Sequence, residues 1–216
     1  MSAIPGCDTI ADISHWSGSV SLVQAKASGL TGIIQKATQG TSYVDPTLTT
    51  NAAGAQAADL PFGTYHFGTN GDGAAQAAFY LQTVHGISGL LALDFEANSS
   101  PPTSMTVAQA EAFVQAIQQA TGIWPGLYCG AYAKSLLGTS TSAVLANCWL
   151  WYAQYGPAPL IPQPTWASWT MWQYTDGQHG VVTTPVPGIG PCDRETFNGS
   201  AGALAKFWTK STVTPA

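Results

Sequence analysis

Residues 89–96 read GLLALDFE, a short apolar run that ends in two carboxylates two positions apart. The run has the length and composition of a buried strand. Side chains along a strand alternate between its two faces, so Asp94 and Glu96 point the same way. Two carboxyl groups held this close repel each other as anions, and the pKa of one should rise. Because only 8% of the residues are charged, the pair indicates acid/base chemistry.

Short apolar runs alternate with helical patterns along most of the 216 residues. Eight strands are predicted, at residues 9–14, 31–37, 61–67, 89–96, 124–130, 148–155, 170–175 and 191–197. The first five are followed by predicted helices, at residues 20–29, 45–59, 72–86, 106–122 and 131–137. Almost no helix is predicted after the last three strands. This alternation is typical of a parallel sheet, and eight units fit a closed TIM-like barrel whose last helices are lost.

The sequence predicts a single α/β domain over residues 1–216, because no linker, internal repeat or low-complexity tail divides it. The clearest helix starts at a capping box formed by Thr106 and Gln109 and ends at Gly122. An open doubly wound sheet is the alternative fold. No GxGxxG phosphate loop supports that alternative.

The composition argues against several partners. With a net charge of -5, the chain has no excess of basic residues that would favour binding to nucleic acid. No apolar run reaches the roughly 20 residues of a membrane span. The N-terminus lacks the pattern of a secretory signal, so we expect release by lysis or a non-classical route, or a signal already removed. We expect a monomer without a cofactor.

Four cysteines are widely spaced and show no metal-binding pattern. Buried thiols are favoured over disulfides for them. They are Cys7, Cys129, Cys148 and Cys192.

The active site of a barrel lies at the C-terminal ends of its strands. By this criterion Asp12, Asp94, Glu96 and Asp193 converge on one rim, because the eighth strand closes beside the first. The alternative is a structural role, in which Asp12 and Asp193 form ion pairs with Arg194 or Lys36 or cap a following turn. No role is evident for Asp8 or Glu195. His15 and His66 could suggest a metal site, but no tight ligand spacing is present, so no metal is predicted.

Aromatic residues near the predicted strand ends suit a sugar cleft. Flat C–H faces of sugar rings stack on aromatic rings, and sugar hydroxyls bond to Tyr and Gln side chains. The expected substrate-binding residues are Tyr65, Tyr128, Trp151, Tyr152 and Gln173. The alternative is that such rings belong to the core.

The chain resembles the glycoside hydrolase family 25 muramidases, the Chalaropsis-type lysozymes. The resemblance covers nearly the whole chain and rests on several segments in the family order. They are DISHWSG (12–18), QKATQGTSYVDP (35–46), GTYHF (63–67), LDFE (93–96), LWYAQY (150–155), MWQYTDG (171–177) and CDRETFNG (192–199). One departure is Gln39, which stands where many members have Glu.

The resemblance implies a (β/α)5(β)3 barrel and hydrolysis of the β-1,4 bond between N-acetylmuramic acid and N-acetylglucosamine in peptidoglycan. It implies that Glu96 is the general acid and Asp94 its partner, with Asp12 and Asp193 on the floor of the site. Tyr65 is expected to contact an N-acetyl group. An enzyme of this kind acts on the bacterial cell wall, outside the cytoplasm, as antimicrobial lysozymes and phage endolysins do.

Two routes are open for the second half of the reaction. Asp94 can orient the substrate's own acetamido group as nucleophile, which the resemblance favours, or a carboxylate can activate water directly. Two other functions are also open. One is a non-catalytic peptidoglycan-binding protein, against which the intact Asp94/Glu96 pair argues. The other is a chitinase-like hydrolase, but the longer acidic run of those enzymes is missing here.

Overall fold

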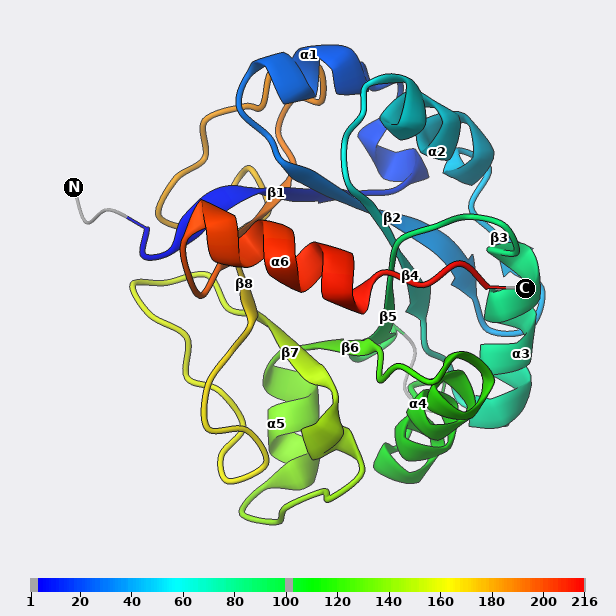
Figure 1. The fold of residues 1–216 in the computed structure, drawn as a ribbon. Coiled ribbons are helices and arrows are strands. Elements are labelled where there is room, and N and C mark those ends of the chain that lie inside the picture. The colour runs from blue at the N-terminus through cyan, green and yellow to red at the C-terminus, as the bar shows by residue number, and fades with distance from the viewer. Residues whose placement is uncertain (1–3, 100–102, 216) are drawn as a thin grey trace.

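The computed structural model describes residues 4–99 and 103–215, which form an eight-stranded barrel with one short extra strand (Figure 1). The strands are β1 (Cys7–Ile13), β2 (Gly32–Gln39), β3 (Tyr43–Val44), β4 (Phe62–Phe67), β5 (Leu90–Phe95), β6 (Gly126–Cys129), β7 (Trp149–Ala153), β8 (Met171–Thr175) and β9 (Asp193–Phe197). Their order is β1-β9-β8-β7-β6-β5-β4-β2-β3, and a further pairing of β1 with β2 closes the barrel. The two-residue β3 lies outside the ring, antiparallel to β2.

The expectation of a wholly parallel sheet is wrong for one barrel strand. β9 runs antiparallel to both of its neighbours, β8 and β1, whereas the other pairs around the ring are parallel. Parallel neighbours need a long crossover, usually a helix, but antiparallel neighbours do not. The helix-free connection from β8 to β9 therefore suits a reversal of direction.

Helices cover the outside of the barrel over its first five units, as predicted. They are α1 (Leu22–Ala27), α2 (Leu48–Ala57), α3 (Gly73–Thr83), α4 (Val107–Thr121) and α5 (Ala131–Leu137). The capping box at Thr106 and Gln109 is present, and Gly122 ends α4 with a φ of 76° in the left-handed region. Thus the local signals in this helix decided its bounds.

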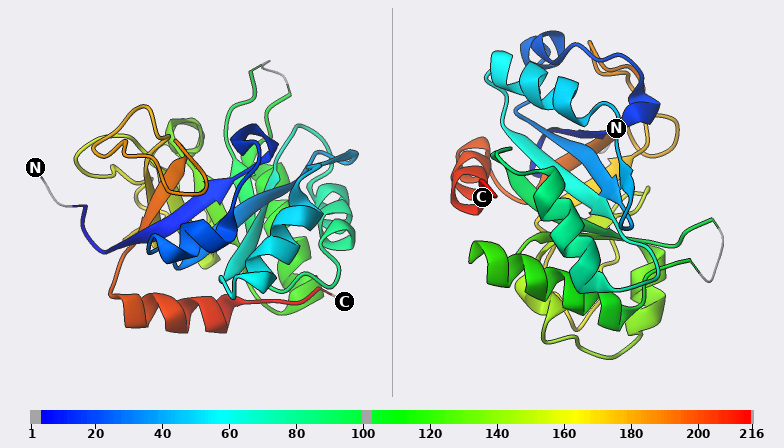
Figure 2. Two further views of the ribbon diagram at one scale, coloured as in Figure 1. Left: turned by 90° about the horizontal axis from the view of Figure 1, so that it is seen from above. Right: turned by 90° about the vertical axis from the view of Figure 1, so that its right-hand side faces the viewer.

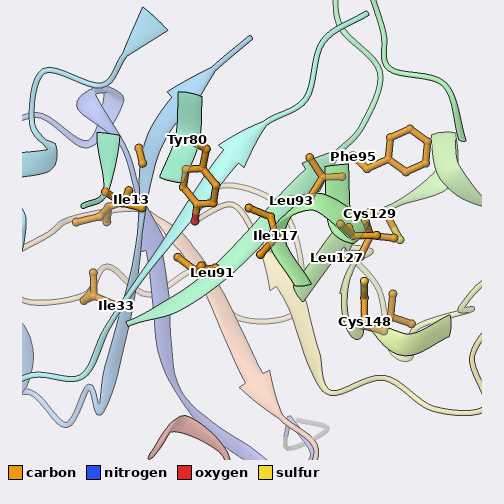
Figure 3. Close-up of a cluster of buried hydrophobic side chains, with 14 of the residues drawn as sticks. Ile13, Ile33, Tyr80, Leu91, Leu93, Phe95, Ile117, Leu127, Cys129 and Cys148 are labelled. Carbon is orange, nitrogen blue, oxygen red and sulfur yellow. The ribbon is translucent and has the colours of Figure 1, made fainter. Parts of the chain in front are cut away.

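The alternation of side chains along β5 divides the interior into two layers. Leu91, Leu93 and Phe95 face the helices, where they join the larger apolar cluster (Figure 3). Leu90 and Ala92 face the inside of the barrel and belong to a second cluster. Asp94 continues the inward series, so strand parity carries its carboxyl group toward the barrel axis.

A sixth helix, α6 (Ala201–Ser211), was not predicted, and it corrects the expectation that the last strands lack helices. It lies beneath one end of the barrel (Figure 2). Leu204 and Trp208 from α6 join the inner cluster, and the Trp208 indole donates to the Phe62 carbonyl oxygen at 3.1 Å. Since Phe62 begins β4, α6 closes the N-terminal end of the barrel and leaves the C-terminal end open.

The cysteines are unpaired, as favoured from their spacing. Cys129, Cys148 and Cys192 are buried, and Cys7 is half-buried. Among the described residues no helix is long and apolar enough to cross a membrane.

We expect Trp208→Ala to lower the free energy of unfolding by about 3–5 kcal/mol, because it removes a buried ring and leaves a cavity at the closed end. Urea denaturation followed by tryptophan fluorescence and circular dichroism measures the change. Val23→Ala on the exposed face of α1 is the control, since Val23 is 63% exposed and should shift stability by less than about 0.5 kcal/mol. Equal midpoints for Trp208→Ala and the wild type would contradict a stabilising role for α6.

Candidate active site

Carboxyl groups from three strands meet at the open end of the barrel. Asp12 lies near the end of β1, and Asp94 lies near the end of β5 with Glu96 just after it. Asp193 is the first residue of β9, and its antiparallel register places it directly opposite Asp12. The reversed direction of β9 thus brings its N-terminal residue to the rim where the parallel strands finish.

A cavity of about 250 Å³ opens between these strand ends. Its walls combine the carboxyl groups with aromatic rings and one amide. It is lined by Asp12, Tyr65, Asp94, Glu96, Tyr128, Trp151, Tyr155, Gln173 and Asp193. The structure therefore brings together every residue predicted for the site except Tyr152.

Tyr152 does not line the cavity, because it lies on the other face of β7 from Trp151. Its ring is buried in the outer apolar cluster between barrel and helices. Tyr155, two residues beyond the end of β7, lines the cavity instead. Parity along β7 could have separated Trp151 from Tyr152, but the course of the loop that carries Tyr155 has no sequence signal.

The amide of Gln173 joins one carboxylate to two phenols. Its Nε2 donates to Asp12 Oδ2 at 2.7 Å, and its Oε1 accepts from the hydroxyls of Tyr128 at 3.0 Å and Tyr155 at 3.2 Å. The Trp151 ring meets Tyr128 edge to face, with centroids 4.8 Å apart. These contacts hold the aromatic wall and Asp12 in one rigid arrangement.

Burial and mutual repulsion disfavour simultaneous ionisation of the carboxyl groups. Burial, followed by the charge of Glu96, raises the pKa of Asp94 well above its ordinary value. Burial and the charge of Asp12 raise the pKa of Glu96. Asp94 Oδ1 is buried and accepts no hydrogen bond from any described residue, so nothing local offsets the loss of water around it. The pair should therefore keep a shared proton to a higher pH than isolated carboxyl groups would.

Lys36 on β2 is a cation whose charge acts on both members of this pair, and it does not form the alternative ion pairs with Asp12 or Asp193. Its Nζ donates to Gln39 Oε1 at 2.8 Å and lies 4.6 Å from the centre of the Phe67 ring. Burial lowers the pKa of Lys36, and the charges of Asp94, Asp45 and Glu96 raise it. Because Gln39 is neutral, the ammonium charge remains directed at the carboxyl groups.

The other cation considered as a partner, Arg194, is also engaged elsewhere. Its guanidinium donates to Asp8 Oδ2 at 2.9 Å, on the face of β9 opposite to Asp193. Arg194 therefore does not pair with Asp193, which lines the cavity. Burial and the charge of Asp12 raise the pKa of Asp193 to about 8.

The two histidines considered for a metal site lie apart in separate hydrogen-bond networks. His66 is buried, with Nδ1 2.7 Å from Thr38 Oγ1 and Nε2 3.2 Å from Gln76 Oε1, and burial lowers its pKa to about 4. His15 Nδ1 lies 2.9 Å from Asp45 Oδ2. Within the described residues no group of three or more His, Cys, Asp or Glu side chains could hold a metal ion.

The family model for glycosyl hydrolases family 25 matches residues 11–181 of the chain. The chain belongs to glycosyl hydrolase family 25. It is therefore a glycosidase, and its relatives of known name agree. The family 25 chain is 32% identical to the N,O-diacetylmuramidase of Chalaropsis sp over 182 residues, covering 76% of this chain and 86% of that protein. It is 28% identical to lysozyme M1 of Streptomyces globisporus, covering 89% and 68%.

Solved structures of the same family share the barrel. The bacterial lysozyme from Streptomyces coelicolor matches with a TM-score of 0.81 at 28% identity, over 97% of this chain and all of that one. A family 25 lysozyme from Aspergillus fumigatus matches with a TM-score of 0.74 at 30% identity, over 91% and 96%. The closed α/β barrel read from the sequence is confirmed.

A small cluster of rings lies between the turn after β1 and the short strand β3 of this family 25 enzyme, and its Trp16 and Tyr43 were not among the predicted site residues. Trp16 is 85% exposed, its ring lies 4.5 Å from that of His15, and His15 in turn lies 6.0 Å from Tyr43. Tyr43 also faces the Lys36 ammonium at 5.6 Å.

Stability of the enzyme should fall as pH rises from about 4 to 8, and Asp193→Asn should reduce the fall by about 2–4 kcal/mol. In the folded protein Asp193 keeps its proton up to pH about 8, while the unfolded chain loses it near 4, so unfolding releases a proton between these values. His66 acts in the opposite direction below pH 6.5, but it is present in both proteins.

Denaturant unfolding at several pH values measures this difference. Asp59→Asn is the matched control, because the Asp59 side chain is fully exposed and lies outside the cavity. Parallel stability curves for the wild type and Asp193→Asn would contradict a protonated, buried Asp193.

Proposed function

We propose that this family 25 enzyme is a peptidoglycan muramidase that cleaves the β-1,4 bond between N-acetylmuramic acid and N-acetylglucosamine. The observation that carries the proposal is the Asp94/Glu96 pair, which lines a cavity with aromatic walls and neighbouring carboxyl groups. The names of the relatives, lysozyme and N,O-diacetylmuramidase, agree with it. Glycan strands of the bacterial wall are then the substrate, and the enzyme acts as a monomer outside the cytoplasm.

Glu96 is the general acid in this proposal. It lies just beyond the end of β5 and is more exposed than Asp94, so it can reach a glycosidic oxygen bound in the cavity. Burial and the charge of Asp12 raise its pKa, which keeps the proton available near neutral pH. As the bond between the anomeric carbon and the bridging oxygen breaks, the Glu96 proton passes to the leaving oxygen.

Asp94 is the partner that positions the nucleophile. A substrate acetamido N–H that donates to Asp94 would favour its ionised form, because this carboxyl group has a buried oxygen without a donor. The proton shared by the pair would then reside on Glu96, where the leaving group needs it. The acetamido carbonyl oxygen attacks the anomeric carbon, and water later opens the resulting ring with retention of configuration.

The remaining residues bind and orient the sugars. Tyr65 stands beside Trp151, with ring centroids 6.2 Å apart at 83°, and contacts the N-acetyl group in this proposal. Tyr128, Trp151, Tyr155 and Gln173 provide the other wall, on which sugar faces stack and to which hydroxyls bond. Asp12 and Asp193 form the floor, and the charge of Asp12 stabilises an oxocarbenium-like transition state.

Glu96→Gln should abolish clearing of purified cell walls, with a loss of at least about 100-fold, because the amide cannot donate a proton to the leaving oxygen. Turbidity and release of reducing ends measure the loss. Glu111→Gln is the matched control, since Glu111 lies on α4, where it accepts from Ser142 Oγ at 2.6 Å. Near-normal clearing by a folded Glu96→Gln protein would overturn the assignment.

The substrate-assisted route predicts that the first product formed has the β configuration at its new reducing end. Proton NMR during the first minutes of hydrolysis reads this anomer before mutarotation. Direct attack by water activated by a carboxylate would instead give the α anomer. An α product would therefore exclude the acetamido route while leaving Glu96 as the acid.

A further inference from the structure

Glu195 is a fully buried carboxyl group that the proposed reaction does not use. It lies on β9, two residues after Asp193 and therefore on the same inward face. The register sets Glu195 opposite Ile10 of β1 on one side and opposite Gln173 of β8 on the other. Since β9 lies between β8 and β1, Gln173 must reach past Glu195 to donate to Asp12.

Neither oxygen of Glu195 has a donor or contact with solvent. The side chain is 0% exposed, and neither Oε1 nor Oε2 accepts a hydrogen bond from any described residue. An ionised carboxylate without water, a cation or a donor is strongly disfavoured inside a protein. Glu195 is therefore a neutral carboxylic acid, and its hydroxyl hydrogen needs an acceptor.

Asp12 is the acceptor that the geometry provides. Both side chains are buried on the inward face of the paired strands β1 and β9, where Asp12 lies opposite Asp193 and so next to Glu195, and a hydrogen bond between them is among the causes of both pKa shifts. Because both groups are acids, such a bond requires one proton between them. Asp12 already receives the Gln173 amide hydrogen at 2.7 Å, which favours its ionised form. The proton of this pair accordingly resides on Glu195.

The surroundings agree with this distribution of charge. Burial and the charge of Asp12 raise the pKa of Glu195 well above its ordinary value. Burial raises the pKa of Asp12 above its ordinary value, and the hydrogen bonds from Glu195 and Gln173 bring it part of the way back down. Asp193 and Cys192 raise the pKa of Glu195 further, and the charge that Glu195 would carry raises the pKa of Tyr155 and Tyr174 in turn.

We infer that Glu195 is a positioning residue that, as a neutral acid, donates a hydrogen bond to Asp12 and holds it as an oriented carboxylate beneath the catalytic pair. The inference rests on the proposed function in that Asp12, once charged, keeps the proton on Glu96. Glu195 does not touch the substrate and transfers no proton during the reaction. Its role is to give the buried Asp12 a second donor without adding a second charge.

The test compares Glu195→Gln, which keeps a donor of the same length but cannot ionise, with Glu195→Leu, which has no donor. We expect Glu195→Gln to keep kcat/KM within about threefold of the wild type, and Glu195→Leu to lose at least about tenfold, as for a lost hydrogen bond to a charged group. In Glu195→Leu the alkaline limb of the pH profile should move to lower pH. Without its donor Asp12 stays protonated to higher pH and no longer supports the proton on Glu96.

A second measurement does not depend on activity. The infrared difference spectrum between wild type and Glu195→Gln near neutral pH should contain the C=O stretch of one protonated carboxyl group. Glu111→Gln, which removes a carboxylate outside the cavity, should lack it. This spectrum needs only Glu195→Gln, so the test stands even if Glu195→Leu fails to fold.

Two results would overturn the inference. One is a difference spectrum that contains only an ionised carboxylate. The other is a folded Glu195→Leu protein with the wild-type rate and pH profile. If the wild type fails to clear walls, the proposed function falls, whereas the infrared result still decides the protonation of Glu195.

Discussion

The pairing of β1 with β9 is the constraint on which the rest of the site depends. It joins the first and last strands of the barrel, and its antiparallel register sets Asp12 opposite Asp193 and Glu195 one inward position deeper. Asp94 and Glu96 alone would be two acids at the end of one strand. The pairing of β1 with β9 adds Asp12, Asp193 and Glu195, whose charges and protons give Asp94 and Glu96 different environments.

The barrel supports these buried acids by supplying few charges and many dipoles. The Gln173 amide donates a hydrogen bond to Asp12 and accepts hydrogen bonds from two tyrosine hydroxyls. These bonds orient all four side chains without introducing a cation. Among the described residues Lys36 is the one ammonium group whose charge acts on the catalytic pair. Its close contacts are a neutral amide and an aromatic ring, which do not cancel that charge. Neutral donors of this kind lower the cost of burying a carboxylate, but they leave its charge available to act on its neighbours.

Much of this arrangement was predictable because local rules decided it. Strand parity within GLLALDFE placed Asp94 and Glu96 on one face, and the capping box at Thr106 placed α4. The direction of β9 was not predictable, because a bare loop permits either direction. The helix α6 was not predicted, although Ser200 caps it and Leu204 and Trp208 are spaced to share one face. The role of Glu195 depends on Asp12, more than 180 positions away in the chain.

The fold also decides when the carboxyl cluster is completed during synthesis. Asp12 lies in the first strand of the barrel and Asp193 in its last, so their pairing awaits the synthesis of every strand between them. Contacts between such distant segments are slow to form, and the tryptophan that closes the other end of the barrel follows later still. A nascent chain therefore carries Asp94 and Glu96 long before Asp193 is available, and the cluster of carboxyl groups is complete only when the barrel closes.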